Sequence, residues 1–168
     1  MVQPWVQPLL NANGTFGGSE FAVAGAGYSS LPAYYAFDGN SSTYARVYYS
    51  NYTSPMSYLA IYNPSPLRIT GLHLVQDTGS YLYTGEIYVS NNGGDWTKLC
   101  DITGNTAVQD FDLSANTGFY NYYKFVPLTT RTSPAWYLSE FTITATHIPL
   151  VYPNAWAAPS ENKWIIKY

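Results

Sequence analysis

The strongest constraint on this chain is a succession of short segments in which apolar and polar residues alternate, separated by turn residues. Residues 85–90 alternate between apolar and polar side chains, and the Asn-Asn-Gly-Gly sequence at 91–94 can adopt the positive φ angles of a hairpin turn. Strand-like segments continue at residues 108–113, 120–127 and 137–145, and no window of the sequence has sustained helical spacing. Short strands joined by Gly, Asn and Pro turns predict an all-β sandwich.

Two further strands are expected before this hairpin. Residues 58–62 form the first, and Pro64 and Pro66 should end it because proline cannot donate a ladder hydrogen bond. Residues 68–75 form the second, which alternates again and contains Gly71. A glycine inside such a strand predicts a β-bulge.

The composition indicates a single domain with an unusual surface. The chain has 168 residues, of which 46% are apolar, so it can build a core of its own. Only 10% of the residues are charged, whereas 18 are tyrosines, whose rings can be buried while their hydroxyls stay in water. Such surfaces suit sugars, stacked aromatic groups or neighbouring protein chains.

The charge distribution argues against nucleic acid as a partner. The net charge is −3, and the seven Lys and Arg residues are scattered singly, so no basic run can track a phosphate backbone. The single cysteine can form no intrachain disulfide. Residues 1–18 contain no basic residue and no long apolar run, so we expect neither a secretory signal nor membrane insertion.

Both ends of the chain are expected to form extended arms. Residues 1–15 are uncharged and carry prolines and apolar side chains, so this arm should dock on its own domain or on another chain. Residues 147–168 contain three prolines and two tryptophans and form the second arm. The sandwich itself is expected to span residues 16–146.

Residues 36–44 combine a carboxylate, a glycine, an amide and three Ser or Thr hydroxyls in a short stretch. Such a stretch can fold around a hard cation, or it can form a tight polar turn. The spacing of the residues alone favours the turn.

Five segments, in order, resemble those of the discoidin domains. These are also called coagulation factor 5/8 type C domains, and they include the family 32 carbohydrate-binding modules. The similar segments are residues 36–44, 58–62, 68–72, 85–96 and 137–143. The first ends in Tyr44, where the family usually has Trp, and the flanking cysteines of the animal domains are absent.

The resemblance implies an antiparallel jelly-roll β-sandwich of about eight strands with a structural calcium ion under one edge. The positions that match the family's calcium ligands are Phe37, Asp38, Asn40, Thr43 and Glu140. The alternative is an Asp-Gly turn, with Glu140 paired to an arginine. The resemblance also implies carbohydrate binding at the level of the family.

In sandwiches of this kind, the loops at one end carry recognition. Aromatic rings can pack on the C–H groups of sugars, and Arg supplies directional hydrogen bonds. The ligand-binding candidates on these grounds are Tyr48, Tyr49, Tyr52, Tyr81, Tyr83, Arg131 and Trp136. His73 is a further candidate. For Trp136 the alternative is a place in the core or at a sheet edge, and for His73 it is a place in a strand.

The sequence offers little support for catalysis. Asp110 and Asp112 lie on one side of an expected strand, where paired carboxylates could hydrolyse glycosides. Such a pair is more often a solvated strand face, so we predict a protein that is not an enzyme.

Two functions fit these observations. The first is a non-catalytic carbohydrate-binding module that attaches to cell-surface glycans. The second is a structural assembly protein whose aromatic arms dock on neighbouring subunits, with no sugar binding. A discoidin-like domain that begins at Met1 without a signal sequence suits a virion component, such as a bacteriophage fibre or decoration protein. The alternative location is extracellular. We expect a homo-oligomer or a larger assembly, with glycans or other virion subunits as partners.

Overall fold

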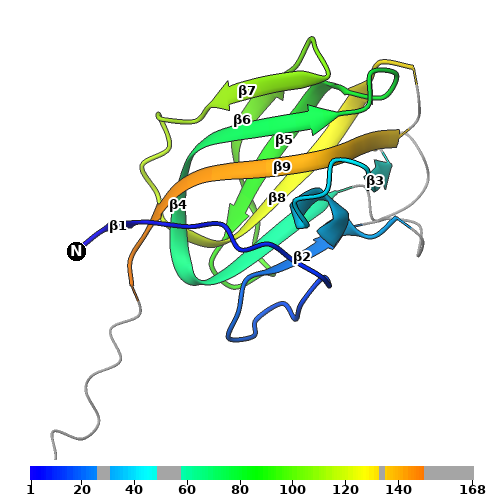
Figure 1. Cartoon of the computed structure of the whole chain (residues 1–168). Coiled ribbons are helices and arrows are strands. Elements are labelled where there is room, and N and C mark those ends of the chain that lie inside the picture. The colour runs from blue at the N-terminus through cyan, green and yellow to red at the C-terminus, as the bar shows by residue number, and fades with distance from the viewer. Residues whose placement is uncertain (26–30, 49–57, 133–134, 150–168) are drawn as a thin grey trace, which may run out of the picture.

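The computed structural model describes residues 1–25, 31–48, 58–132 and 135–149. Within these residues the chain forms nine strands and one short 3-10 helix (Figure 1). No described helix is long and apolar enough to cross a membrane. The elements are β1 (Gln3–Pro4), β2 (Ala22–Gly25), η1 (Ala33–Phe37), β3 (Ala45–Tyr48), β4 (Leu59–Gln76), β5 (Leu82–Ser90), β6 (Thr97–Thr103), β7 (Val108–Asp112), β8 (Tyr120–Thr130) and β9 (Ala135–His147).

The strands form two layers that share β4. The first half of β4 pairs with β2 and β8, and β5 and β6 follow β8 in the same layer. The second half of β4 pairs with β9 and β7, and β1 and β3 pair with β9. Every pairing is antiparallel, which confirms the predicted antiparallel β-sandwich.

The prolines at 64 and 66 do not end a strand, as the sequence had suggested. They lie inside β4, where its register against β8 shifts between Tyr62 and Leu67. At this bend the Asn121 side chain donates hydrogen bonds to the carbonyl oxygens of Asn63 (2.9 Å) and Pro64 (3.0 Å). A residue without an N–H group fits here because β4 is passing from one layer to the other.

Two other local predictions are confirmed. The register of β4 against β9 shifts between Ile69 and Gly71, which is the expected bulge. Gly93, in the turn between β5 and β6, has a φ of 74°. The side chain of Asn92 supports this turn by accepting hydrogen bonds from the backbone N–H groups of Gly94 and Asp95.

The core between the layers is aromatic at its centre. Phe141 on β9 has ring contacts with Phe37 (centroids 5.4 Å apart), Phe125 (4.8 Å) and Trp136 (6.4 Å). All four side chains are about 1% exposed. These contacts hold η1 against β9 and so fix where the loop that follows η1 begins.

The N-terminal arm docks on its own domain along β9. Gln3 and Pro4 pair with the end of β9, and Trp5 N donates to Ala145 O (3.0 Å). Further along, the Gln7 amide imitates a strand, because its nitrogen donates to Phe141 O and its oxygen accepts from Ile143 N, both at 2.8 Å. Residues 150–168 of the expected C-terminal arm lie outside the described part of the chain.

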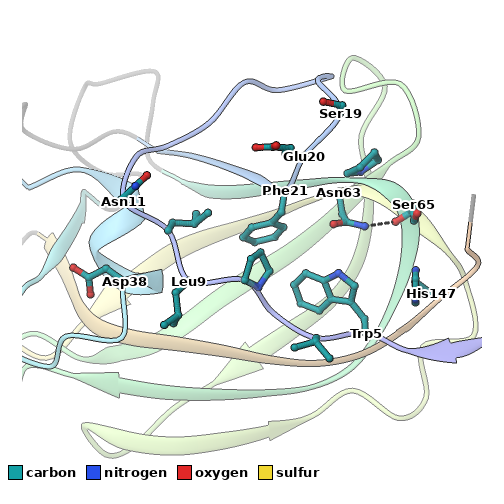
Figure 2. A pocket seen from close by; sticks show the side chains of 14 residues that line it. Trp5, Leu9, Asn11, Ser19, Glu20, Phe21, Asp38, Asn63, Ser65 and His147 are labelled. Carbon is teal, nitrogen blue, oxygen red and sulfur yellow. Dashed lines mark hydrogen bonds between the residues drawn. The ribbon is translucent and has the colours of Figure 1, made fainter.

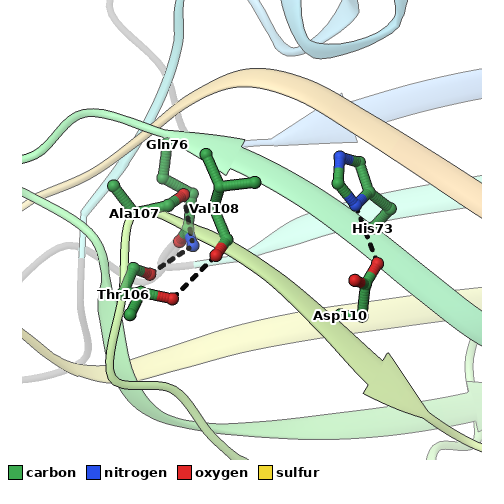
Figure 3. Close-up of polar contacts among 6 residues, drawn as sticks. All are labelled: His73, Gln76, Thr106, Ala107, Val108 and Asp110. Atoms are coloured by element: carbon green, nitrogen blue, oxygen red, sulfur yellow. Dashed lines mark hydrogen bonds and ion pairs between the residues drawn. The ribbon is translucent and has the colours of Figure 1, made fainter.

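Gln76, at the end of β4, links four segments through its buried side chain. Its Oε1 accepts hydrogen bonds from Trp136 Nε1 (2.5 Å) and Leu82 N (3.1 Å). Its Nε2 donates to the carbonyl oxygens of Thr106 and Ala107 (Figure 3). The amide therefore ties the start of β5, the connection between β6 and β7, and β9 to the end of β4.

We predict that Gln76→Leu lowers the free energy of unfolding by about 2–5 kcal/mol, because two buried N–H donors lose their acceptor. His73→Leu is the matched control on the same strand, because His73 is half-exposed and pairs only with the exposed Asp110. Its effect should stay within about 1 kcal/mol. Denaturant unfolding of both variants measures the difference, and equal midpoints would contradict the role assigned to Gln76.

Candidate functional site

A rigid turn between β4 and β5 forms one end of the sandwich. Asp77 Oδ1 accepts a hydrogen bond from Gly79 N (2.9 Å), and Ser80 N donates to Asp77 O (3.1 Å). The connection after β8 holds the turn from outside. Arg131 donates to Thr78 O (3.2 Å), and the Thr132 hydroxyl donates to Gly79 O. Most of the backbone N–H and C=O groups of the turn are thus hydrogen-bonded.

A pocket of about 360 Å³ lies beside this turn, lined by Tyr44, Asp77, Ser80 and Tyr137. Asp77 and Tyr137 are held together by their backbones, because Asp77 N donates to Tyr137 O (3.2 Å) and Tyr137 N donates to Ser80 O (3.4 Å). Tyr44 is 38% exposed at the pocket rim. The guanidinium carbon of Arg46 lies 5.1 Å from the centroid of the Tyr137 ring.

This arrangement suits a small polyhydroxylated ligand. Two tyrosine rings offer faces for C–H groups, while a carboxylate and a hydroxyl offer directional hydrogen bonds. Asp77 Oδ1 accepts from Gly79 N, and Oδ2 of the same carboxylate has acceptor capacity for a ligand.

Three of the predicted ligand residues cluster next to the same turn. The rings of Tyr81 and Tyr83 lie 5.3 Å apart, and the guanidinium carbon of Arg131 lies 5.5 Å from the Tyr81 centroid. Tyr81 is only 7% exposed, whereas Tyr83 is 37% exposed. A hydrogen bond with Tyr81 is the main cause that raises the pKa of Tyr83, with burial adding to it.

The prediction for Trp136 was wrong. Its side chain is 1% exposed and donates to Gln76, so it supports the loops from the core and offers no face to a ligand. His73 is also not part of this end, because it lies on β4 and pairs with Asp110 of β7 at 2.7 Å (Figure 3). Of the remaining candidates, Tyr48 is described only by its backbone pairing with Ala135, and Tyr49 and Tyr52 lie outside the described residues.

The sequence reasoning missed Asp77, Ser80 and Tyr137, and it considered Tyr44 only as part of a motif. One signal was available, because Asp-Thr-Gly-Ser at 77–80 is a typical turn sequence directly after a strand. Its meeting with Tyr137 follows from the pairing of β4 with β9 and is not visible in either segment alone.

The loop after η1 forms the polar turn that its residues permit. Asp38 Oδ1 accepts from Asn40 N (2.8 Å), and its Oδ2 lies 2.8 Å from the Thr43 hydroxyl. The same hydroxyl is 2.7 Å from Asn40 O. Gly39 has a φ of 71°, which favours glycine at this position.

Glu140 of β9 lies near this loop, because the charge of Asp38 acts on it. Phe37, which precedes Asp38, and Phe141, which follows Glu140, are in ring contact, with centroids 5.4 Å apart. Burial raises the pKa of Glu140, and the negative charge of Asp38 raises it further. A paired arginine would act in the opposite direction, so the alternative in which Glu140 pairs with an arginine is not supported.

The oxygen atoms of this loop fit a hard cation such as calcium. The Thr43 hydroxyl lies within hydrogen-bond distance of Asp38 Oδ2 and of the Asn40 carbonyl, and Glu140 is near enough for the charge of Asp38 to act on it. The Phe37 carbonyl already accepts from Leu10 N (2.9 Å). No group of three or more His, Cys, Asp or Glu side chains that could hold a metal occurs within the described residues. A cation here would therefore rely on two carboxylates and several neutral oxygens.

A larger pocket, of about 750 Å³, marks where the arm lies on the domain (Figure 2). The Trp5 and Phe21 rings, 5.3 Å apart, form its apolar part, and Glu20 and Asp38 contribute charge. Leu9 of the arm lies directly over Gly39. The arm thus borders the acidic loop as well as β9.

Comparison with known proteins gives a family and a fold. Residues 18–141 match the sequence model of the F5/8 type C domain. No curated protein sequence matches the chain significantly.

Solved structures of similar fold include several sugar-binding modules. A family 32 module of NanJ from Clostridium perfringens, in complex with galactose, has a TM-score of 0.62 at 15% identity, over 85% of this chain and 98% of that one. Chitosan-binding module 2 of a chitosanase/glucanase from Paenibacillus sp. IK-5, in complex with chitotriose, has a TM-score of 0.58 at 22% identity, over 75% and 95%. At these identities the likeness establishes the fold.

Proposed function

Because the chain belongs to the F5/8 type C, or discoidin, domain family, we propose that it is a non-catalytic carbohydrate-binding module that attaches to cell-surface glycans. The observation that carries this proposal is the pocket formed by Tyr44, Asp77, Ser80 and Tyr137. The neighbours in complex with galactose and chitotriose support a saccharide as the ligand.

In the proposed complex, a sugar ring packs its C–H face on Tyr137 or Tyr44, and its hydroxyls donate to Asp77. Arg131 and Tyr83 lie on the outer side of the turn and contact a second sugar unit of a longer chain. The turn is rigid before the ligand arrives, so binding costs little loop ordering.

Asp110 and Asp112, the two carboxylates that could have formed a catalytic pair, each contact a different residue. Asp110 pairs with His73, and Asp112 accepts from Ser114 N at 2.8 Å. The hydrogen bond from Ser114 also lowers the pKa of Asp112. The carboxyl group of Asp112 therefore favours its ionised form, which has no proton to donate. Each of the two carboxylates is thus engaged by its own partner.

We also propose a structural calcium ion held by Asp38, Asn40, Thr43 and Glu140, with the Phe37 carbonyl as a further oxygen. The ion would offset the repulsion between the two carboxylates and link the loop after η1 to β9. The motivating observation is the cluster of Asp38, Asn40 and Thr43 oxygens, with Glu140 near enough for the charge of Asp38 to raise its pKa.

The assembly role remains a second candidate, because the docked arm presents Val6 (84% exposed) and Leu9 (74% exposed) to solvent. Exposed apolar side chains of this kind favour contact with a neighbouring subunit. The virion context stays a prediction.

Measurement of the mass of the protein in solution tests whether it assembles into an oligomer, and a monomer at every concentration would contradict the assembly role.

For the sugar pocket, we predict that Asp77→Asn and Tyr137→Ala each weaken glycan binding about tenfold or more. Asn retains an oxygen that can accept from Gly79 N, so the first variant removes the charge without opening the turn. Titration calorimetry with galactose and chitotriose, preceded by a glycan array, provides the measurement. His73→Ala, on β4 and outside the pocket, should bind as the wild type does. Unchanged affinity in both pocket variants would reject this site.

For the cation loop, we predict that Glu140→Gln raises the melting temperature at pH 7 in chelator. The folded-state pKa of Glu140 is raised, so its contribution to stability is present when it is protonated and is lost as the pH rises through that pKa. The gain should therefore shrink below about pH 4. Glu86→Gln is the control of opposite sign, because hydrogen bonds from Lys98 and Tyr88 lower the pKa of Glu86.

Calcium should then raise the melting temperature of the wild type and leave Glu140→Gln nearly unchanged. At a concentration one hundred times the dissociation constant, the gain is about 2.7 kcal/mol, or roughly 5–10 °C for a domain of this size. Identical wild-type curves with calcium and with chelator would contradict the calcium proposal.

A further inference from the structure

A second groove lies on the outer face of the sheet, far from the pocket at the Asp77 turn. It has a volume of about 480 Å³, and its walls are Phe16, Tyr58, Trp96 and Tyr122. It adjoins the β5–β6 turn, whereas the sugar pocket adjoins the turn before β5. The nine residues of β5 therefore separate the two sites by about 30 Å.

The floor of the groove is a row of residues across four strands. Ala24 of β2 pairs with Ala60 of β4, which pairs with Lys124 of β8, which pairs with Tyr88 of β5. Two alanines side by side leave a hollow, and the larger rings stand around it. Lys124 faces away from the core, because Tyr123 and Phe125 on either side of it in β8 are buried, whereas Ala60 beneath it is itself buried.

The walls are preformed. The Tyr122 ring contacts Tyr62 (centroids 4.7 Å apart), Phe16 (6.1 Å) and Trp96 (6.4 Å). Gly93 brings the β5–β6 turn against the same ring, where a side chain at this position would lie within 3.2 Å of Tyr122. A ligand would thus meet aromatic faces that need no rearrangement.

Lys124 is the only charged residue that lines the groove within the described part of the chain. Its Nζ lies 4.2 Å from the Trp96 ring centroid, 5.4 Å from that of Tyr88 and 5.7 Å from that of Tyr58. Burial lowers its pKa. The neighbouring carboxylate of Glu86 is already engaged by Lys98 and by the Tyr88 hydroxyl, both at 2.7 Å.

An ammonium group in this position has aromatic rings around it but no counter-ion. Within the described residues, the salt bridges join Lys98 to Glu86 and to Asp101, and His73 to Asp110, and none includes Lys124. A partly desolvated cation gains more from an anion than an exposed one does, because less water screens the pair.

We propose that this groove is a second saccharide site, which binds a sugar that carries a carboxylate. The sugar ring packs on Trp96 and Tyr122, and its carboxylate pairs with the ammonium of Lys124. The proposal rests on the groove alone and does not depend on the pocket at the Asp77 turn. A glycan with acidic and neutral units would engage the module at two places.

The test uses a trimer of galacturonic acid and its methyl ester, which is the uncharged match. Titration calorimetry of the wild type should give tighter binding of the acid than of the ester, weakened by added salt. Lys124→Met keeps an unbranched side chain beside Trp96 and removes the charge. It should lower affinity for the acid about tenfold or more and abolish the salt dependence. Lys124→Arg should restore both.

Asp77→Asn separates the two sites. It should weaken galactose binding at the loop end and leave binding of the galacturonate trimer unchanged, and Lys124→Met should do the reverse. If galactose fails to bind, while the galacturonate trimer binds and only Lys124→Met weakens that binding, the site at the Asp77 turn is rejected and the site in the groove is supported. Equal affinity of the wild type for acid and ester, or unchanged binding by Lys124→Met, would overturn the groove and leave Lys124 with a packing role.

Discussion

The sharing of β4 between the two layers is the constraint on which the rest of this structure depends. Its first half pairs with β2 and β8 and its second half with β9 and β7, so both sheets take their register from one strand. The bend between these halves tolerates Pro64 and Pro66, and Asn121 satisfies the backbone oxygens there. Where β4 ends, Gln76 fixes the neighbouring segments, and the Asp77 turn begins on that rigid base.

Because the chain has few charged residues, it is informative to ask which ionisable groups have a partner of opposite charge and which do not. With 10% charged residues, several carboxylates and cations have assigned partners, such as Glu86 with Lys98 and Asp110 with His73. Glu140 faces a like charge, and Lys124 faces only rings. Uncompensated charge in a partly desolvated place costs free energy unless a ligand compensates it. Both proposed charged-ligand sites stand at such places, one for a cation and one for an anion.

The accuracy of the sequence predictions follows the range of the interactions involved. The bulge at Gly71 and the turn at Gly93 depend on local backbone preferences, and both were predicted from neighbouring residues. The position of Trp136 depends on its reach to Gln76 across the core. It was named as a ligand candidate with the core as the alternative, and the structure places it in the core. Tyr81, Tyr83 and Arg131 were chosen for their chemistry, and the structure brings them together because Arg131 N pairs with Tyr81 O.

The sequence by itself determined the class of fold, because the alternation of apolar and polar residues in strands and the residues typical of turns can both be recognised within short segments. It also determined that residues 36–44 could make a polar turn around Asp38. The resemblance to the discoidin domains already placed Glu140 beside this turn. Only the tertiary structure decided that Asp77 lies beside Tyr137 and that Lys124 stands among aromatic rings. These contacts join residues that are distant in the chain. Strand register sets them, and register is a property of the whole sheet that no single segment carries.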